Sequence, residues 1–213
     1  MAIIQSVLDT DLYKFTTSYA YSKLYPRAYG QFRFIDRGKT TYPQGFAEEL
    51  KKEIQEMSKL ALTKDEASFL SRELPYLPPT YIDFVRGFRF DPEEVKVEQD
   101  AEGHLSIIAE GLLYRVTLWE TPILALVSEL YYKMLGAQPD MEYTERTIIS
   151  KARKLAEHGI TFSMFGMRRR FSAAIEDRVT ELLKEYAAGY LFGTSNVYYA
   201  YKHGLRVSGT HPH

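Results

Sequence analysis

The part of the chain after residue 140 alternates between helical and strand patterns, and this alternation constrains the fold more than any other feature. The successive patterns are a helix over 143–158, an apolar strand over 161–166, a helix over 171–188, an apolar run over 190–196, a helix over 197–203 and a strand over 205–210. Alternation of this kind, with short turns, is typical of a parallel α/β sheet or barrel. The sequence therefore predicts an α/β fold.

The part before residue 140 mixes helices and strands without that alternation. Helical patterns, helped by the capping box Thr63–Glu66, cover 9–26, 46–57, 63–74, 78–88 and 120–135. Strand patterns cover 28–36 and three runs between residues 95 and 119. We therefore expect an α+β N-terminal domain over residues 1–138 and the start of an α/β barrel over residues 139–213, divided near "LGAQPDMEY".

Charge and composition exclude several classes of function. The formal net charge of the 213 residues is −1, so nucleic acid and acidic membranes are not expected partners, despite the run "MRRRF". The lack of cysteine excludes disulfides, thiolate metal sites and a cysteine nucleophile. The N-terminus lacks a signal-peptide pattern, and no apolar run approaches the ~20 residues of a membrane span. We expect a cytoplasmic protein.

Polar and basic residues follow each expected strand of the second part. The three strand ends carry "FGMRRR" (165–170), "GTSN" (193–196) and "GTHPH" (209–213). Because chemistry in α/β barrels sits on loops at the C-terminal ends of strands, these loops are the expected site.

The three arginines of the first loop have two interpretations. They could form a solvated start of the helix that follows. However, cations are disfavoured at a helix N-terminus by the dipole, which favours an anion that binds them. Phe165 precedes them, so an aromatic face and a guanidinium would project from one turn.

Other polar residues are ambiguous when taken alone. Residues 193–196 either cap the following helix or hold an anion with backbone N–H groups. Asp9 and Asp11 are interpreted first as helix caps, and Tyr13 as a core or surface aromatic residue. His104, His158 and His203 are expected to be inert, whereas His211 and His213 follow a strand end beside the other two loops.

Taken together, these motifs resemble the nicotinate phosphoribosyltransferase family. The matching motifs are "TDLYK" (10–14), "ETPILALVSELYY" (120–132), "FGMRRRFS" (165–172), "GTSNVYYA" (193–200) and "GTHPH" (209–213). They occur in the family's order across nearly the whole chain, and the family's chains continue well beyond the last of them.

The resemblance implies a reaction. Family members join nicotinate to phosphoribosyl pyrophosphate, which forms nicotinate mononucleotide and releases pyrophosphate in NAD salvage. ATP hydrolysis is coupled to this step through a phosphohistidine, so ATP and Mg²⁺ are expected cofactors. The fold implied is an incomplete type II phosphoribosyltransferase barrel, and the assembly implied is a homodimer with shared active sites.

The resemblance also implies roles for individual residues, although no metal ligand is assigned. His213 is the expected phosphohistidine, and the pyridine ring is expected between Phe165 and Tyr13 from the other subunit. Arg168, Gly209 and Thr210 are expected to face nicotinate or the ribosyl phosphate. Ser195 stands where nicotinamide-using relatives carry an aspartate, and this favours a carboxylate substrate because an aspartate would repel one.

Three functional alternatives stay open at this stage. The chain is part of an ATP-coupled nicotinate phosphoribosyltransferase, or a non-catalytic dimerisation or ligand-binding module of that family, or a nicotinamide-using relative. His211 lies where a variable residue is expected, and it could compete with His213 for a phosphoryl group.

Overall fold

The structure is a computed structural model that describes residues 2–38 and 40–209. The first part consists of α1 (Leu12–Leu24), β1 (Tyr29–Arg33), α2 (Phe46–Met57), α3 (Lys64–Glu73), α4 (Pro79–Gly87), the 3-10 turn η1 (Pro92–Glu94), β2 (Val95–Gln99), β3 (Leu105–Leu112), α5 (Leu113–Val116), the 3-10 turn η2 (Thr117–Trp119) and α6 (Glu120–Met134). The second part consists of α7 (Met141–Glu157), β4 (Phe162–Met164), the 3-10 turn η3 (Met167–Arg169), α8 (Ala173–Tyr186), β5 (Leu191–Thr194), α9 (Val197–His203) and β6 (Arg206–Val207).

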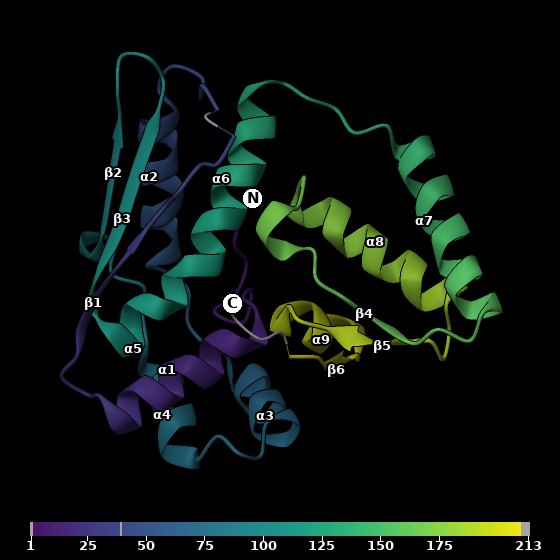
Figure 1. Ribbon diagram of the computed structural model, residues 1–213. Helices are drawn as coiled ribbons and strands as arrows, with labels where there is room; N and C mark the ends of the chain where they lie inside the picture. Colours follow the sequence, from purple (N-terminus) through teal and green to yellow (C-terminus); the bar gives the residue numbers. More distant parts are fainter. Residues whose placement is uncertain (1, 39, 210–213) are drawn as a thin grey trace.

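The first part is built on an antiparallel sheet with the strand order β1-β3-β2. Helix α2 packs against both β2 and α6, so the sheet and two helices enclose the apolar side chains between them (Figure 1). The predicted capping box at Thr63 is present at the start of α3. The expectation of a mixed helix and sheet part is confirmed.

The strand expected over residues 112–119 is wrong, because this segment forms α5 and η2. Arg115 and Trp119 are four residues apart, a spacing that puts both side chains on one helical face. Arg115 Nε donates to Glu94 Oε1 at 2.7 Å, and Trp119 Nε1 donates to Glu94 Oε2 at 2.9 Å. Glu94 can contact both side chains only if they lie close together. This shared partner therefore favours a helix over a strand, in which the two side chains would lie further apart.

The first helix also begins later than expected. Residues Asp9 and Thr10 lie before it, and α1 starts at Leu12. Asp11 forms an isolated β-bridge with Asn196, and the Val197 amide donates to the Thr10 carbonyl at 3.0 Å. These long-range backbone contacts keep Asp9 and Thr10 outside the helix.

The second part contains a parallel sheet with the strand order β4-β5-β6. Helix α8 connects β4 to β5, α9 connects β5 to β6, and α7 packs against α8 (Figure 1). The α/β class predicted from the alternation is therefore confirmed. That this sheet opens a barrel stays a prediction, as does the domain boundary near residue 138, which falls in the connection between α6 and α7.

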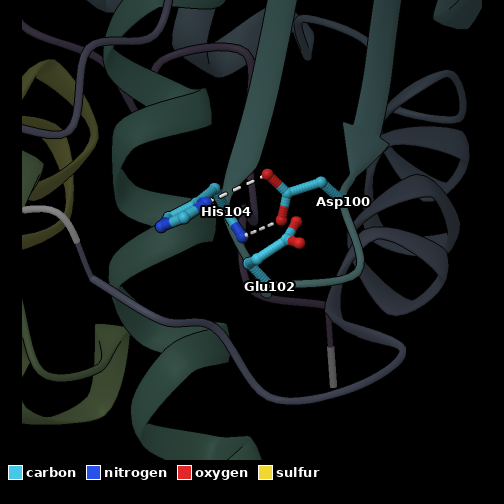
Figure 2. Close-up of side chains that lie close together, drawn as sticks. All are labelled: Asp100, Glu102 and His104. Atoms are coloured by element: carbon cyan, nitrogen blue, oxygen red, sulfur yellow. Dashed lines mark hydrogen bonds and ion pairs between the residues drawn. The ribbon is translucent and has the colours of Figure 1, made fainter.

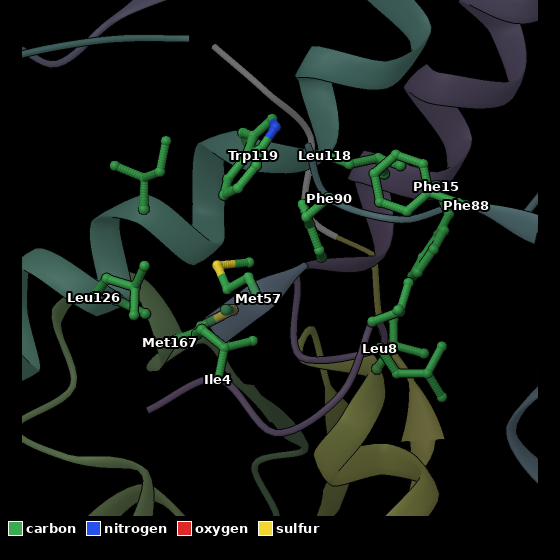
Figure 3. Close-up of a cluster of buried hydrophobic side chains, with 14 of the residues drawn as sticks. Ile4, Leu8, Phe15, Met57, Phe88, Phe90, Leu118, Trp119, Leu126 and Met167 are labelled. Carbon is green, nitrogen blue, oxygen red and sulfur yellow. The ribbon is translucent and has the colours of Figure 1, made fainter. Parts of the chain in front are cut away.

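One hydrophobic core joins the two parts. It contains Trp119 and Phe90, whose ring centroids are 4.6 Å apart, and it also contains Met167 of η3. Figure 3 shows Met167 beside Ile4 and Leu126. Met167 therefore anchors the turn that carries the adjacent Arg168. Among the described helices, none is long and apolar enough to cross a membrane.

Candidate active site

The start of α1 lies across the C-terminal ends of the parallel strands. The Leu12 amide donates to the Ser195 carbonyl at 2.8 Å, and the Ser195 amide donates to the Met164 carbonyl at 3.0 Å. Gly209, after β6, also lies against α1, because a Cβ built on it would be 3.4 Å from Leu12 Cδ2. Loops that are far apart in the sequence thus meet at one edge of the sheet.

Three side chains from this edge form a group that we call the outer triad: Asp11, Arg168 and Ser195. Ser195 Oγ donates to Asp11 Oδ1 at 2.6 Å, and Arg168 Nε lies 3.4 Å from Asp11 Oδ2. Burial raises the pKa of Asp11, although Ser195 and Arg168 act in the opposite direction. Because 44% of the Arg168 side chain is exposed, its guanidinium is open to a second anion.

Three further residues form an inner triad directly beneath: Asp9, Arg170 and Asn196. Arg170 donates from Nη1 to Asp9 Oδ1 at 3.1 Å and from Nη2 to Asp9 Oδ2 at 3.2 Å. Asn196 Nδ2 donates to Asp9 Oδ1 at 2.8 Å. All three residues are buried, so the bidentate pair is shielded from solvent.

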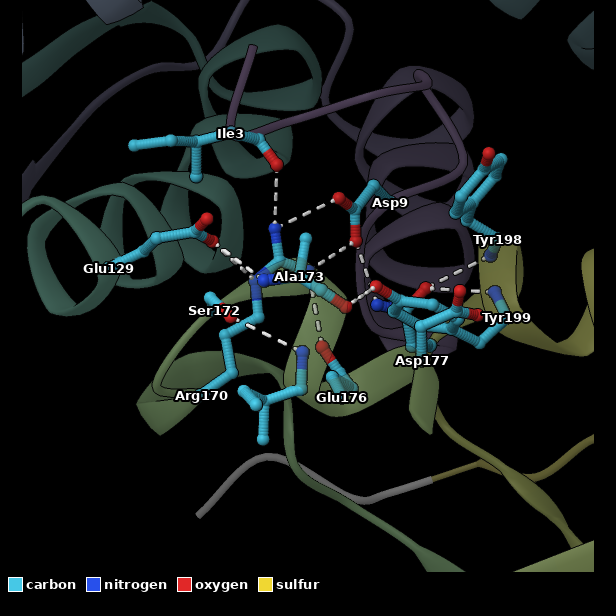
Figure 4. Close-up of polar contacts among 12 residues, drawn as sticks. Ile3, Asp9, Glu129, Arg170, Ser172, Ala173, Glu176, Asp177, Tyr198 and Tyr199 are labelled. Carbon is cyan, nitrogen blue, oxygen red and sulfur yellow. Dashed lines mark hydrogen bonds and ion pairs between the residues drawn. The ribbon is translucent and has the colours of Figure 1, made fainter. Parts of the chain in front are cut away.

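Arg170 has more carboxylate neighbours than one positive charge can balance (Figure 4). Besides Asp9, Glu176 Oε2 accepts from its Nη1 at 3.1 Å and Glu129 Oε2 lies 3.4 Å from its Nε. Burial raises the pKa of Glu176 to about 8 and also raises that of Glu129. Glu176 Oε1 has no hydrogen-bond partner within the described residues. Burial therefore favours the protonated form of Glu176, although the positive charge of Arg170 acts in the opposite direction.

Tyr13 lies in the interior of its own chain, next to the outer triad. Its hydroxyl donates to Glu120 Oε1 at 3.0 Å, while Lys14 Nζ pairs with Glu120 Oε2 and lies 4.5 Å from the Tyr13 ring centroid. Burial raises the pKa of the Tyr13 hydroxyl, and the negative charges of Glu120 and Asp11 raise it further. The positive charge of Arg168 lowers it. That Tyr13 serves the site of another subunit stays a prediction.

Phe165 is the exposed aromatic residue of the site. It follows β4, and 53% of its surface is accessible, whereas Met167 in the same turn is buried. An aromatic face and the Arg168 guanidinium therefore project from one turn, as the sequence suggested. Thr210, His211 and His213, which the sequence also assigned to the site, lie outside the described residues.

The interpretation of the arginines as one anion-binding group is wrong for Arg170. Helix α8 begins only at Ala173, with Ser172 as its N-cap, and the arginines occupy η3 and its end. Arg170 is neutralised by carboxylates of its own chain, while Arg168 and Arg169 remain exposed. Only these two are accessible to an external anion.

Two interpretations of hydroxyl and acidic residues are also corrected. The amides of Ser195 and Asn196 donate to protein oxygens, so they do not hold an external anion, and the Asn196 side chain caps α9 instead. Within the described residues, neither Asp9 nor Asp11 caps α1 through its side chain. Asp9 pairs with Arg170 and Asp11 pairs with Arg168. These arginines are distant in sequence but are brought next to the aspartates by the fold.

Three residues around the site were not predicted from the sequence: Glu120, Glu129 and Arg170. A signal was present for the two glutamates, because they are charged residues in a helical segment that is otherwise apolar nearly all round. Charges in such a position need partners. No local pattern distinguished Arg170 from its two arginine neighbours.

Asp100, Glu102 and His104 could converge on a metal ion at the turn between β2 and β3 (Figure 2). Their ligand atoms lie within 4.8 Å of one another. Asp100 accepts from the His104 amide at 2.7 Å and lies 3.0 Å from His104 Nδ1, contacts that close the hairpin. In Figure 1 this turn lies at the top of the antiparallel sheet, away from the start of α1. Within the described residues, it is the only group of three or more acidic or histidine side chains with this spacing.

The fold defines an α/β protein in which one turn at this edge carries an exposed aromatic residue and a half-exposed arginine. Sequence models of the nicotinate phosphoribosyltransferase N-terminal domain and of the nicotinate phosphoribosyltransferase family match residues 8–128 and 160–213 respectively. The chain belongs to the nicotinate phosphoribosyltransferase family.

Individual relatives agree with this assignment. A nicotinate phosphoribosyltransferase of Chromohalobacter salexigens is 40% identical over 99% of this chain and 54% of its own length. The crystal structure of a nicotinate phosphoribosyltransferase from Porphyromonas gingivalis is 66% identical, with a TM-score of 0.96 over 99% of this chain and 54% of that one. The crystal structure of a putative nicotinate phosphoribosyltransferase from Saccharomyces cerevisiae is 29% identical. Its TM-score is 0.90, and the match covers 100% of this chain and 55% of that one. The chain thus spans about half the length of these relatives.

Proposed function

We propose that the chain supplies the nicotinate-binding part of a nicotinate phosphoribosyltransferase that acts in NAD biosynthesis. The observation that carries this proposal is the shared turn of Phe165 and Arg168, which lies against Asp11 and Ser195. A flat ring with a carboxylate matches an exposed aromatic face beside a half-exposed guanidinium. The family names of the relatives support the same substrate.

In the proposed reaction, the pyridine nitrogen of nicotinate forms a bond to C1 of the ribose in phosphoribosyl pyrophosphate. The bond from C1 to the pyrophosphate oxygen breaks, and pyrophosphate leaves with the electron pair. This displacement passes through an oxocarbenium-like state, so the protein acts mainly by positioning and by charge. Phe165 would stack on the ring, and Arg168 would bind the carboxylate.

Asp11 would adjust the charge on Arg168. In the free site it is the counter-ion of Arg168, at 3.4 Å, and it accepts from Ser195. A bound carboxylate brings a second negative charge beside Asp11, which disfavours its ionised form. The site would therefore bind nicotinate with Asp11 protonated, and the Asp11–Ser195 contact can survive that change because a carboxyl group still accepts.

The coupling to ATP rests on the resemblance to the family. In this proposal, an imidazole nitrogen of His213 attacks the γ-phosphorus of ATP, the bond to the bridging oxygen breaks, and ADP leaves. Mg²⁺ would arrive with the nucleotide phosphates, and we assign it no protein ligands. His213→Ala should abolish acid-labile phosphate incorporation from labelled ATP, with His104→Ala as the matched control. Label that persists in the His213 variant would instead indicate His211 or another acceptor.

Gly209 and Thr210 complete the proposed substrate site. Gly209 is exposed beside Leu12, at the end of β6, which suits close approach of a phosphate or carboxylate to the backbone. The resemblance assigns both residues to nicotinate or to the ribosyl phosphate. A shared site in a homodimer, to which Tyr13 of one subunit contributes, is part of the same proposal.

The alternative function is that of a ligand-binding or dimerisation module without turnover. It is favoured by the exposure of Phe165, which leaves an aromatic side chain available to a ligand or to another subunit. Turnover of labelled nicotinate should be compared for the chain alone and for the chain joined to the remaining part of the P. gingivalis relative. Activity of the longer polypeptide alone would mean that the 213 residues act as a module. Inactivity of both, with no nicotinate binding, would contradict the proposed function.

A further inference from the structure

Three segments of the chain each contribute one residue to the outer triad and one to the inner triad. Asp11 and Asp9 come from the segment before α1, Arg168 and Arg170 from the turn after β4, and Ser195 and Asn196 from the end of β5. In each triad the aspartate pairs with the arginine and accepts from the residue after β5. The two layers therefore repeat the same arrangement.

The two arginine–aspartate pairs differ strongly in rigidity. Arg170 and Asp9 are each 1% exposed at the side chain and make two parallel hydrogen bonds. Arg168 is 44% exposed and has a single ion-pair contact with Asp11. A bidentate buried pair fixes both position and orientation, whereas a half-exposed contact is screened and leaves rotamer freedom.

Arg170 is also bound by elements outside the triads (Figure 4). Its Nη2 donates to the Ile3 carbonyl at 2.9 Å, and its own carbonyl accepts from Ser128 Oγ on α6 at 2.9 Å. Glu176 on α8 accepts from its Nη1. The N-terminal segment, α6 and α8 therefore all converge on the residue that ends the turn bearing Phe165 and Arg168.

We infer that Arg170 is a positioning residue, which fixes the turn carrying Phe165 and Arg168 against the segment carrying Asp11. Only the exposed Arg169 separates it from Arg168, so a shift at Arg170 moves the outer guanidinium directly. Arg170 is buried beneath the site and is not assigned a contact with the substrate. The consequence for nicotinate rests on the proposed function, but the consequence for the geometry of the turn does not.

The experiment compares Arg170→Lys with Arg115→Lys, a matched control that breaks the Arg115–Glu94 pair in the first part of the molecule. Lysine keeps the positive charge but loses the planar fork. Amide hydrogen exchange of residues 165–169 and the affinity for nicotinate are measured for both variants. Asp9→Asn provides a second test from the other side of the pair, should Arg170→Lys fail to fold.

We expect Arg170→Lys to speed exchange in residues 165–169 at least tenfold and to raise the Kd for nicotinate at least tenfold. In an active longer polypeptide, the KM for nicotinate should rise while the KM for phosphoribosyl pyrophosphate stays within twofold. Exchange at 165–169 that is unchanged, or that rises equally in Arg115→Lys, would overturn the inference. If the unaltered protein binds no nicotinate, the proposed function fails, while the exchange measurement still decides the role of Arg170.

Discussion

Arg168 Nε lies 3.4 Å from Asp11 Oδ2, although 157 residues separate the two in sequence and nearly half of the arginine side chain is exposed. Solvent screens this pair only from the arginine side, because just 4% of the Asp11 side chain is exposed. A ligand carboxylate that replaced Asp11 on Arg168 would leave a buried carboxylate without its counter-ion, so the replacement favours protonation of Asp11. In the proposed function, Arg168 would bind the carboxylate of nicotinate, and the protonation state of Asp11 would change when the ligand binds.

Asp11→Asn should remove a pH dependence from nicotinate binding. The pKa of Asp11 is already raised by burial, and a bound carboxylate beside it raises the pKa further, so binding takes up a proton. Affinity in the unaltered protein should consequently fall as pH rises above the ordinary aspartate range. Calorimetry between pH 5 and 8 should show a weaker slope for Asp11→Asn, and an identical slope would contradict the role of Asp11.

The Glu176→Gln substitution should raise the free energy of unfolding relative to the unaltered protein, and more so as pH rises. The pKa of Glu176 is raised by burial from 4.5 to about 8, so its contribution to folding is present below about 4.5 and is lost as pH rises towards 8. Urea unfolding at pH 8 should favour the variant by roughly 2–5 kcal/mol relative to pH 4.5. Glu181→Gln, at an exposed partner of Arg178, should show no such trend. Parallel pH curves for the two variants would refute the buried neutral carboxyl group.

Gly193→Ala should disrupt the pairing of β5 with β6. A Cβ at this position would lie 2.3 Å from the Arg206 carbonyl oxygen, a backbone atom that cannot move without displacing the strand. We expect a loss of about 2–4 kcal/mol in the free energy of unfolding. Gly87→Ala is the control, because among described atoms none lies within 4 Å of its Cβ position. Equal stability of the two variants would show that β6 is not fixed as described.

Ser195→Asp should shift preference from nicotinate towards nicotinamide. The new carboxylate would lie beside that of Asp11, which Ser195 Oγ now contacts at 2.6 Å, and both would oppose a substrate carboxylate. The ratio of the two affinities should change at least tenfold. Ser195→Ala removes the hydroxyl without adding charge and should change that ratio much less. If Ser195→Asp leaves the ratio of the nicotinate and nicotinamide affinities unchanged, Ser195 does not determine substrate specificity.

Local patterns predicted much of the fold because helix signals are local. The capping residues Thr63 and Glu66 and the proline at the start of α4 act within one turn, and the helix–strand alternation after residue 140 fixed the α/β class. The error at 112–119 had a non-local cause. Glu94, outside that segment, binds Arg115 and Trp119 together and stabilises a helical turn.

The sequence predicted that the loops after the parallel strands meet, but it did not predict the inner triad. Phe165, Arg168, Ser195 and Gly209 were found because they follow strands, and topology brings strand ends together. The inner triad could not be predicted in this way, because Arg170 and Asp9 are 161 residues apart and neither has a distinctive local pattern. Which of three consecutive arginines is buried depends on the tertiary packing of Met167 and α8.

The most direct test of the proposed site is a calorimetric titration of nicotinate into the protein and into two variants, Arg168→Ala and Arg169→Ala. Both arginines are exposed neighbours in one turn, but of the two, within the described residues, Arg168 alone forms an ion pair with Asp11. Loss of a charge-assisted contact of about 1.5–3 kcal/mol predicts that Arg168→Ala weakens binding at least tenfold. Arg169→Ala should remain within twofold of the unaltered protein. Equal affinities for the two variants would contradict the site.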